Sequence, residues 1–346
     1  MSSKLPRYDR HRSYDWNYDH APDPVELDVA PVSGDWAFCG IHVSSPLGVP
    51  AGPLLNGRWI LYYASLGFDV LTYKTVRSRF RPCYTLPNLQ PIECGQLNGS
   101  EGELAATDHM TGSWAVSFGM PSQEPSVWRE DIERTRKQLA SQKVLSVSVV
   151  GTVQDGWTTD DLAHDYAQCA KWAVEAGADC VETNFSCPNV LTCDGQLFQN
   201  PAQASMVAQA VRERIGTTPY VVKVGHVTQR SDAEALLKAL SPIVTAIALT
   251  NSVATRVRDD RNELLFDGQP RGICGQAILD ASIHQTRLFQ EVIQEHALTT
   301  ELIGVGGVRD ADHVRKYLQA GAHAVHLATA AMVNPGVALE IRSEFG

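Results

Sequence analysis

The stretch EAGADCVETN, residues 175–184, decides the fold because it contains a joint between a helix and a strand. The helical pattern before it ends at Gly177, a residue type that readily takes the left-handed turn which stops a helix. An apolar run begins three residues later, at Cys180. Three joints of this kind indicate a protein in which helices and strands alternate. The other two are SLGFDVLTYK, residues 65–74 with Gly67, and QAGAHAVHLA, residues 319–328 with Gly321.

Eight short apolar runs separated by helical patterns predict an α/β fold of the (β/α)8 TIM barrel type. Because nearly all their residues are apolar, the runs are typical of parallel strands that are buried on both faces. An open, doubly wound sheet is the alternative, and the absence of a G-x-G-x-x-G fingerprint weakens it. The expected strands are 48–52, 70–75, 144–151, 180–186, 221–225, 246–251, 302–308 and 324–330.

The remaining segments give the predicted domain organisation. Residues 1–35 form a polar N-terminal extension, and residues 36–346 form a single barrel domain. Residues 36–52, WAFCGIHVSSPLGVPAG, predict a hairpin that leads into the first strand. Residues 77–142 are too many for a simple connection after the second strand. They predict a long loop insertion that covers the C-terminal mouth of the barrel, where active sites of this fold form.

Composition and charge exclude several classes of protein. The chain has 346 residues, of which 44% are hydrophobic and 20% charged, as in an ordinary globular protein. A formal net charge of −10 without any basic run argues against a nucleic-acid partner. The N-terminus has no apolar stretch typical of a signal peptide or membrane span, so we expect a cytoplasmic protein with no membrane partner. Eight cysteines without a C-x-x-C pair predict reduced thiols and no metal site.

Small residues after the last two strands predict a phosphate site. Gly306 and Gly307 follow strand seven, and Ala328 and Thr329 follow strand eight. These are the places where barrels commonly hold a phosphate on backbone N–H groups. The glycine pair alone would equally fit a tight turn. In RGICGQAI, residues 271–278, Gly275 adds a second point where the backbone can approach a ligand closely.

Polar side chains at other strand ends suggest what the rest of the ligand is. Lys74 and Lys223 interrupt apolar strands, and a buried lysine is costly unless it meets an anion or an acceptor. The two together suggest an anionic ligand, with a structural ion pair or snorkelling as the alternative. Asn184, Asn189 and Asn251 offer the donors and acceptors that suit a pyrimidine-type ring. Individually, each asparagine fits a capping role equally well.

The thiol of Cys187 is the candidate reacting group. It lies in the polar segment VETNFSCPNV, residues 181–190, where the usual interpretation of a cysteine as a buried, inert side chain weakens. A free thiol has a pKa of about 8.5, so a small thiolate fraction can act as nucleophile or as base. A nucleophilic cysteine usually has a histidine partner, and none shares a strand-end motif with it. We therefore favour the role of general base.

Six motifs together resemble those of the dihydroorotate dehydrogenases, FMN enzymes of pyrimidine biosynthesis. In chain order they are ETNFSCPNV, VVKVG, LTNS, GICGQAI, IGVGGV and GAHAVHLATA, within a resemblance that covers about residues 36–340. The resemblance implies that the 36–346 domain binds FMN. It also implies that Cys187 is the catalytic base of the class 1 branch, since the membrane-bound branch has serine there. The implied reaction converts dihydroorotate to orotate: Cys187 takes the C5 proton while hydride passes from C6 to flavin N5.

The same resemblance assigns further residues to the site. Lys223 would lie near N1 and the C2 carbonyl, where the reduced flavin carries its charge, and so joins Cys187 as a catalytic residue. A partner subunit for electron transfer and a homodimer are also expected from the family. The implied FMN-binding residues are Ala51, Gly52, Lys74, Thr75, Asn184, Lys223, Gly275, Gly306, Gly307, Ala328 and Thr329. The implied substrate-binding residues are Lys74, Gly119, Met120, Asn184, Asn189, Asn251 and Ser252.

Three departures from the family pattern concern the substrate. The first is that the family's basic element after the second strand is blurred into FRPCYTLPN, residues 80–88. Val116 stands where the family usually has an asparagine, and the loop after Asn189 differs and brings in Cys193. An FMN enzyme for another dihydropyrimidine or cyclic amide is therefore the alternative function. A flavoprotein that only relays electrons, and a phosphate-handling barrel isomerase without flavin, are alternatives from other classes.

Overall fold

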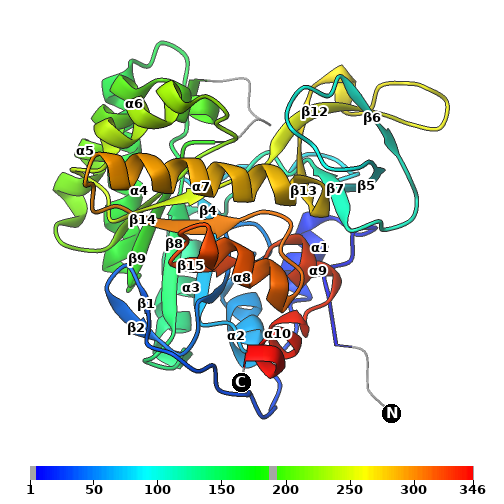
Figure 1. Cartoon of the computed structure of the whole chain (residues 1–346), viewed down its shortest axis with the longest axis horizontal. Coiled ribbons are helices and arrows are strands. Elements are labelled where there is room, and N and C mark those ends of the chain that lie inside the picture. The colour runs from blue at the N-terminus through cyan, green and yellow to red at the C-terminus, as the bar shows by residue number, and fades with distance from the viewer. Residues whose placement is uncertain (1–4, 187–192, 346) are drawn as a thin grey trace.

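The computed structural model describes residues 5–186 and 193–345, and its centre is a closed barrel of eight parallel strands surrounded by helices (Figure 1). This arrangement confirms the predicted (β/α)8 barrel. The ring closes where β9 pairs with β10. The strands in order around the barrel are β10 (Tyr220–Lys223), β11 (Ala246–Leu249), β14 (Glu301–Val305), β15 (Ala324–His326), β3 (Leu47–Val49), β4 (Val70–Val76), β8 (Val144–Val149) and β9 (Cys180–Asn184).

The glycines at the three joints end their helices as predicted. Their φ angles are +92° at Gly67 and +103° at both Gly177 and Gly321, a region that other residues rarely adopt. In each case a barrel strand begins three residues later. The helices are α1 (Tyr14–Asp19), α2 (Gly57–Ser65), α3 (Pro125–Gln138), α4 (Thr159–Glu175), α5 (Pro201–Ile215), α6 (Arg230–Leu240), α7 (Leu279–Glu295), α8 (Ala311–Gln319), α9 (Thr329–Val333) and α10 (Val337–Phe345).

The insertion after the second barrel strand contains three strands and is therefore more than the long loop that the sequence suggested. They pair with two strands from the connection after β11, and the five form a second, small barrel at one side of the molecule (Figure 1). The pairing of Val116 with Gly272 joins segments that are far apart in the chain, so no local pattern indicated it. The strands are β5 (Leu89–Glu93), β6 (Glu103–Ala106), β7 (Ser113–Val116), β12 (Val253–Arg258) and β13 (Arg271–Gly275).

The predicted hairpin consists of β1 (Trp36–Phe38) and β2 (Ile41–Val43) and closes the N-terminal end of the barrel. Phe38 and Val43 are buried in one cluster with the first inward side chains of the barrel strands, such as Val70 and Val144. The floor of the barrel is therefore apolar and sealed. Any ligand must enter at the opposite, C-terminal end.

The N-terminal extension packs against the barrel domain. Tyr8 and Tyr14 are buried, and both rings contact the edge or face of Phe118, with centroid distances of 6.0 and 6.1 Å. The division of the chain at residue 35 stays a prediction. No helix in the described part of the chain is long and apolar enough to cross a membrane.

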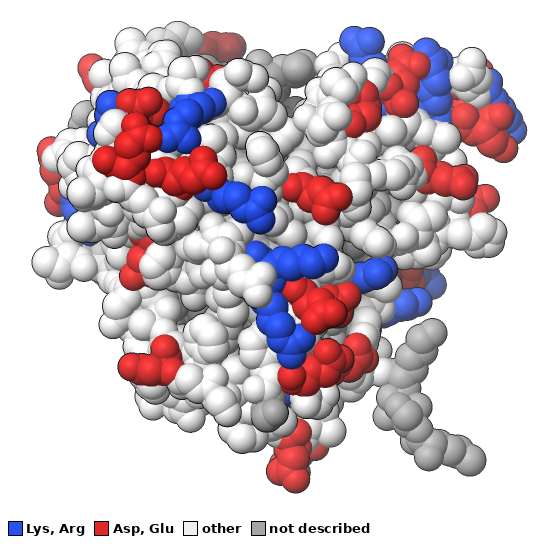
Figure 2. All heavy atoms as spheres, in the orientation of Figure 1, with Lys and Arg blue, Asp and Glu red and all other residues white. Residues whose placement is uncertain are grey.

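Charged side chains on the surface occur mostly as neighbours of opposite sign. On the face shown in Figure 2, basic and acidic groups are interspersed. Arg230, for example, pairs with both Glu291 and Glu295. Pairs of this kind, with both partners about half exposed, contribute little to stability.

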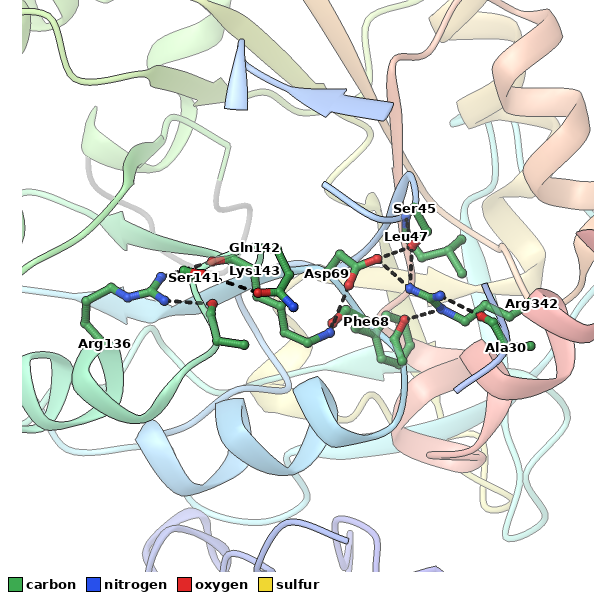
Figure 3. A network of polar contacts seen from close by, with 12 residues as sticks. Ala30, Ser45, Leu47, Phe68, Asp69, Arg136, Ser141, Gln142, Lys143 and Arg342 are labelled. Atoms are coloured by element: carbon green, nitrogen blue, oxygen red, sulfur yellow. Dashed lines mark hydrogen bonds and ion pairs between the residues drawn. The ribbon is translucent and has the colours of Figure 1, made fainter. Parts of the chain in front are cut away.

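A buried charge network lies at the N-terminal end of the barrel (Figure 3). Asp69, which directly precedes β4, is 1% exposed, and its carboxylate accepts hydrogen bonds from Ser45 (2.5 Å), Lys143 (2.8 Å) and Arg342 (2.5 Å). The Arg342 guanidinium also donates to the carbonyls of Gly67 and Ala30. The network ties the C-terminal helix α10 to the barrel wall.

Candidate active site

Two adjoining cavities lie at the C-terminal ends of the barrel strands. The larger, about 250 Å³, is lined by Gly306 and Gly307 and is called the glycine cavity below. The smaller, about 120 Å³, is lined by Lys74 and Lys223 and is called the lysine cavity. The two form one elongated site, since they share five lining residues. These are Asn251, Cys274, Val305, Ala328 and Thr329.

The glycine cavity has the features of a phosphate cradle. Gly306 and Gly307 have φ of +131° and +73°, and a Cβ at either would collide with the start of α7, at 2.3 Å from Ser282 Oγ and 2.6 Å from Leu279 Cβ. Only glycine allows this backbone to run so close to the helix. The hydroxyl Oγ1 of Thr329 lines the cavity and is buried without a hydrogen-bond partner among the described residues. A phosphate oxygen would give it one.

Gly275 also lines the glycine cavity, but a contact within the protein is what requires glycine at this position. Its φ is +97°, and a Cβ would lie 2.2 Å from the carbonyl oxygen of Gly112. The close approach is therefore between two strands of the small barrel, β13 and the start of β7. Contact of Gly275 with a ligand stays a prediction.

Lys74 lies at the wall of the lysine cavity and is nearly fully buried. Its ammonium donates to the carbonyl of Gly52 at 3.2 Å and lies 4.3 Å from the ring centroid of Phe118. The faces of the Phe118 and Tyr14 rings attract the ammonium and so offset part of the cost of burying its charge. Since Phe118 in turn packs on Tyr8 and Tyr14, the N-terminal extension supports this wall.

Lys223 is the second buried cation, 3% exposed at the end of β10. No described residue forms a hydrogen bond or ion pair with its ammonium, and Lys223 lines the lysine cavity. It interacts electrostatically with Glu182 on the neighbouring strand β9: burial raises the pKa of this carboxyl, and the Lys223 charge and a hydrogen bond from Ser148 oppose the rise. Ser148 is also 3.1 Å from Thr75 Oγ1. The barrel interior beneath the cavity is thus polar.

The asparagines hold the loops as well as lining the cavity. Asn184 Oδ1 accepts from the backbone N–H and the hydroxyl of Ser186, at 3.1 and 3.2 Å, and Asn251 Nδ2 donates to the Ser186 carbonyl at 2.6 Å. Asn184 and Asn251 therefore both bind the loop backbone, which is the capping role that the sequence offered as the alternative. It does not use all of their donors and acceptors.

The far wall of the lysine cavity comes from the insertion after β4. Gly119 and Met120 line it, with φ of +74° and +51°, and the buried Arg77 donates to the Met120 carbonyl at 3.0 Å. Val116 lines the same wall beside Phe118, so the position is apolar. The insertion covers the site, as the sequence suggested.

The structure brings most of the predicted site residues together. Ser252 is buried next to Asn251 but lines neither cavity. Cys187 and Asn189 lie outside the described residues. The predicted residues that line the two cavities are Ala51, Gly52, Lys74, Thr75, Gly119, Met120, Asn184, Lys223, Asn251, Gly275, Gly306, Gly307, Ala328 and Thr329.

Several residues at the site were not predicted. The apolar ones give no signal that separates them from core residues. His326 is different, because it interrupts an apolar strand in the way that the lysines do. The unpredicted residues include Trp114, Phe118, Cys274, Met332 and His326, which line the cavities, and Glu182, which interacts with Lys223.

The fold and the site define the class of protein. A (β/α)8 barrel with a phosphate cradle at one end of an elongated cavity and two buried ammonium groups at the other suits an anionic nucleotide with a polar ring. Unpartnered buried atoms, such as Thr329 Oγ1 and the ring nitrogens of His326, also line this cavity. The residues present therefore fit a flavin mononucleotide.

The chain belongs to the dihydroorotate dehydrogenase family. The family model described as dihydroorotate dehydrogenase matches residues 35–346, which include every residue of the predicted barrel domain. The protein is thus an oxidoreductase of a family that acts in pyrimidine biosynthesis and uses FMN.

Similar proteins agree with this assignment. The dihydroorotate dehydrogenase of Dictyostelium discoideum is 29% identical over 97% of this chain and 96% of its own length. The catalytic subunit of dihydroorotate dehydrogenase B (NAD(+)) of Desulforudis audaxviator is 27% identical over 89% of this chain and 90% of its own length. The crystal structure of the Eimeria tenella enzyme in complex with ferulenol has the same fold, with a TM-score of 0.75, 16% identity and coverage of 96% and 88%.

Proposed function

We propose that this protein oxidises dihydroorotate to orotate with FMN bound across the glycine and lysine cavities. The observation that supports this most is the union of the two cavities, which joins a phosphate cradle to the buried ammonium groups of Lys74 and Lys223. Gly306, Gly307 and Thr329 would hold the phosphate, and Lys223 would hold the polar edge of the ring.

The reaction removes a proton and a hydride from adjacent carbons of the substrate. When bound, FMN supplies the acceptor for the hydride that leaves C6. Cys187 takes the proton from C5, and Asn184, Asn189 and Asn251 hold the pyrimidine by hydrogen bonds. Lys223 supplies positive charge in a water-poor site, where such a charge acts most strongly. The cysteine at this position, where the membrane-bound branch has serine, supports assignment to class 1.

Anaerobic titration of the purified protein with dihydroorotate tests the proposed function. We expect a yellow protein whose flavin absorbance band bleaches with one equivalent of dihydroorotate. A colourless protein that does not take up FMN would contradict the proposed cofactor. A yellow protein that does not bleach would contradict the proposed substrate.

Replacement of Cys187 tests the proposed base. In Cys187→Ala we expect bleaching to slow by about 10²- to 10⁴-fold with an unchanged flavin spectrum. Cys193→Ala, six residues further along the chain, is the matched control and should bleach at the wild-type rate. An unaffected Cys187→Ala protein would indicate that the chain only relays electrons. A slow Cys193→Ala protein would move the base to Cys193.

A second candidate substrate is another dihydropyrimidine or cyclic amide, and Val116 favours it. This apolar residue lies in the cavity wall where the family usually has an asparagine, and an unpaired polar edge of the ring costs about 1–3 kcal/mol. Bleaching by dihydrouracil but not by dihydroorotate would support this candidate. In that case Val116→Asn should shift the preference toward dihydroorotate.

The acceptor of the electrons is tested by turnover. Some relatives are named as catalytic subunits of an NAD(+)-type enzyme, which suggests a partner subunit for this chain as well. Turnover of the isolated chain with fumarate would make a partner unnecessary. The expected homodimer is tested by its mass in solution.

A further inference from the structure

His326 lies inside the barrel and lines the glycine cavity. It is the last residue of β15, is 2% exposed, and its ring stacks on Phe38 of the hairpin with centroids 5.8 Å apart. The neighbouring strand leaves room for the ring because it has Gly48 beside it, where a Cβ would lie 2.4 Å from the imidazole. The ring is therefore held in one place by Phe38 and the backbone of β3.

Neither ring nitrogen of His326 has a hydrogen-bond partner in the described part of the chain, although both are buried. Buried polar atoms without partners are rare in proteins and call for an explanation. Burial, helped by the positive charge of Lys223, lowers the pKa of His326 to about 3. The ring is thus a neutral imidazole with one unused N–H donor and one unused acceptor.

The position of His326 indicates what it meets. It lines the glycine cavity together with Val305, which also lines the lysine cavity. A ligand with its phosphate at Gly306 and Gly307 and its ring at Lys223 must place its connecting chain between these ends. The group that lies there in FMN is a polyol, whose hydroxyls can each donate and accept.

We propose that His326 binds the polyol chain of the cofactor by a hydrogen bond between Nδ1 and a hydroxyl group, since Nε2 packs against Gly48 of β3. The inference rests on the proposed function, because it takes FMN as the occupant of the cavities. It adds a binding residue that acts on neither the phosphate nor the reacting ring.

The test compares a flavin that has the polyol phosphate chain with one that lacks the whole chain. Apoprotein is titrated with FMN and with lumiflavin, which has the ring but no polyol or phosphate, and binding is followed by quenching of flavin fluorescence. In His326→Leu we expect about 3- to 10-fold weaker binding of FMN, since one hydrogen bond is lost, and unchanged binding of lumiflavin. His326→Gln, whose amide offers a donor and an acceptor, should recover FMN affinity to within about threefold.

Other outcomes overturn the inference. Unchanged FMN affinity in His326→Leu would mean that the nitrogens do not bind the ligand, and an equal loss for both flavins would mean that the imidazole only fills space. If His326→Leu does not fold, the ring nitrogen resonances of ¹⁵N-histidine-labelled wild-type protein decide. They should shift with FMN and not with lumiflavin, and no shift with FMN contradicts the proposal. Wild-type apoprotein that binds no FMN contradicts the proposed function instead.

Discussion

The two ends of the barrel bury charge in opposite ways. At the N-terminal end, the Asp69 carboxylate accepts hydrogen bonds from Ser45, Lys143 and Arg342 (Figure 3). At the C-terminal end, the Lys223 ammonium has no hydrogen-bond partner among the described residues and acts only electrostatically on Glu182. A buried charge that is fully paired serves the fold, whereas one that is left unpaired costs stability and is retained for a ligand. The four experiments below test this distinction.

Loss of the carboxylate at the N-terminal end should have the largest effect. Asp69→Ala leaves the guanidinium of Arg342 buried without its counter-charge, so we expect the free energy of unfolding to fall by about 3–5 kcal/mol. Urea denaturation measures it. The double variant Asp69→Ala/Arg342→Met should recover part of the loss, because it removes both charges. A loss below about 1 kcal/mol in Asp69→Ala would contradict a stabilising role of the network.

Loss of the ammonium at the C-terminal end should instead affect chemistry. In Lys223→Met we expect reduction of the flavin by substrate to slow by about 10²- to 10³-fold, as when a preorganised group that stabilises charge is removed. Stability should stay the same or rise, since a buried charge without a hydrogen-bond partner is removed, and the carboxyl of Glu182, whose pKa is already raised, can take up a proton. Stopped-flow absorbance measures the rate of flavin reduction, and urea denaturation measures the free energy of unfolding. A Lys223→Met protein that is unstable but fully active would mean that Lys223 serves the fold and not the ligand.

The third experiment compares how the free energy of unfolding depends on pH in wild type and in His326→Gln. The two should differ by up to about 1.4 kcal/mol per pH unit. The folded pKa of about 3 lies below the ordinary value of about 6.5, so the stability that this group contributes is present above pH 6.5 and is lost as the pH falls toward 3. Glu182, with its raised pKa, acts in the opposite direction but is common to both proteins compared. Between pH 6 and 5, wild type should lose up to about 1.4 kcal/mol relative to His326→Gln. Parallel curves would mean that the imidazole is not buried in its neutral form.

The sequence predicted the barrel because its joints are local. Gly67, Gly177 and Gly321 have the positive φ that their positions after helices require, and each precedes a strand at a fixed spacing. The small barrel could not be predicted in this way. Its strands are short, and the pairing of Val116 with Gly272 depends on contacts across the whole fold.

The site was predictable where a polar residue interrupts an apolar strand. This signal led to Lys74 and Lys223, and it applies equally to His326 and Glu182. The two were missed because the predicted strands ran on past them, to residues 330 and 186, whereas the observed strand β15 ends at His326. The apolar wall residues Trp114 and Phe118 carry no such signal. Only their position in three dimensions separates them from the core.

We expect the smallest loss of stability when an exposed ion pair is removed. This variant tests whether the Asp69 network stabilises the fold because its charges are paired or because they are also buried. Arg230 contacts both Glu291 and Glu295, yet its side chain is 44% exposed and those of the two glutamates are 54% and 58% exposed. If pairing alone stabilised the fold, Arg230→Ala should resemble Asp69→Ala. Because water and salt screen exposed charges, we expect a loss below about 1 kcal/mol that shrinks further in 1 M salt. A loss above about 2 kcal/mol would show that burial is not what gives the Asp69 network its strength.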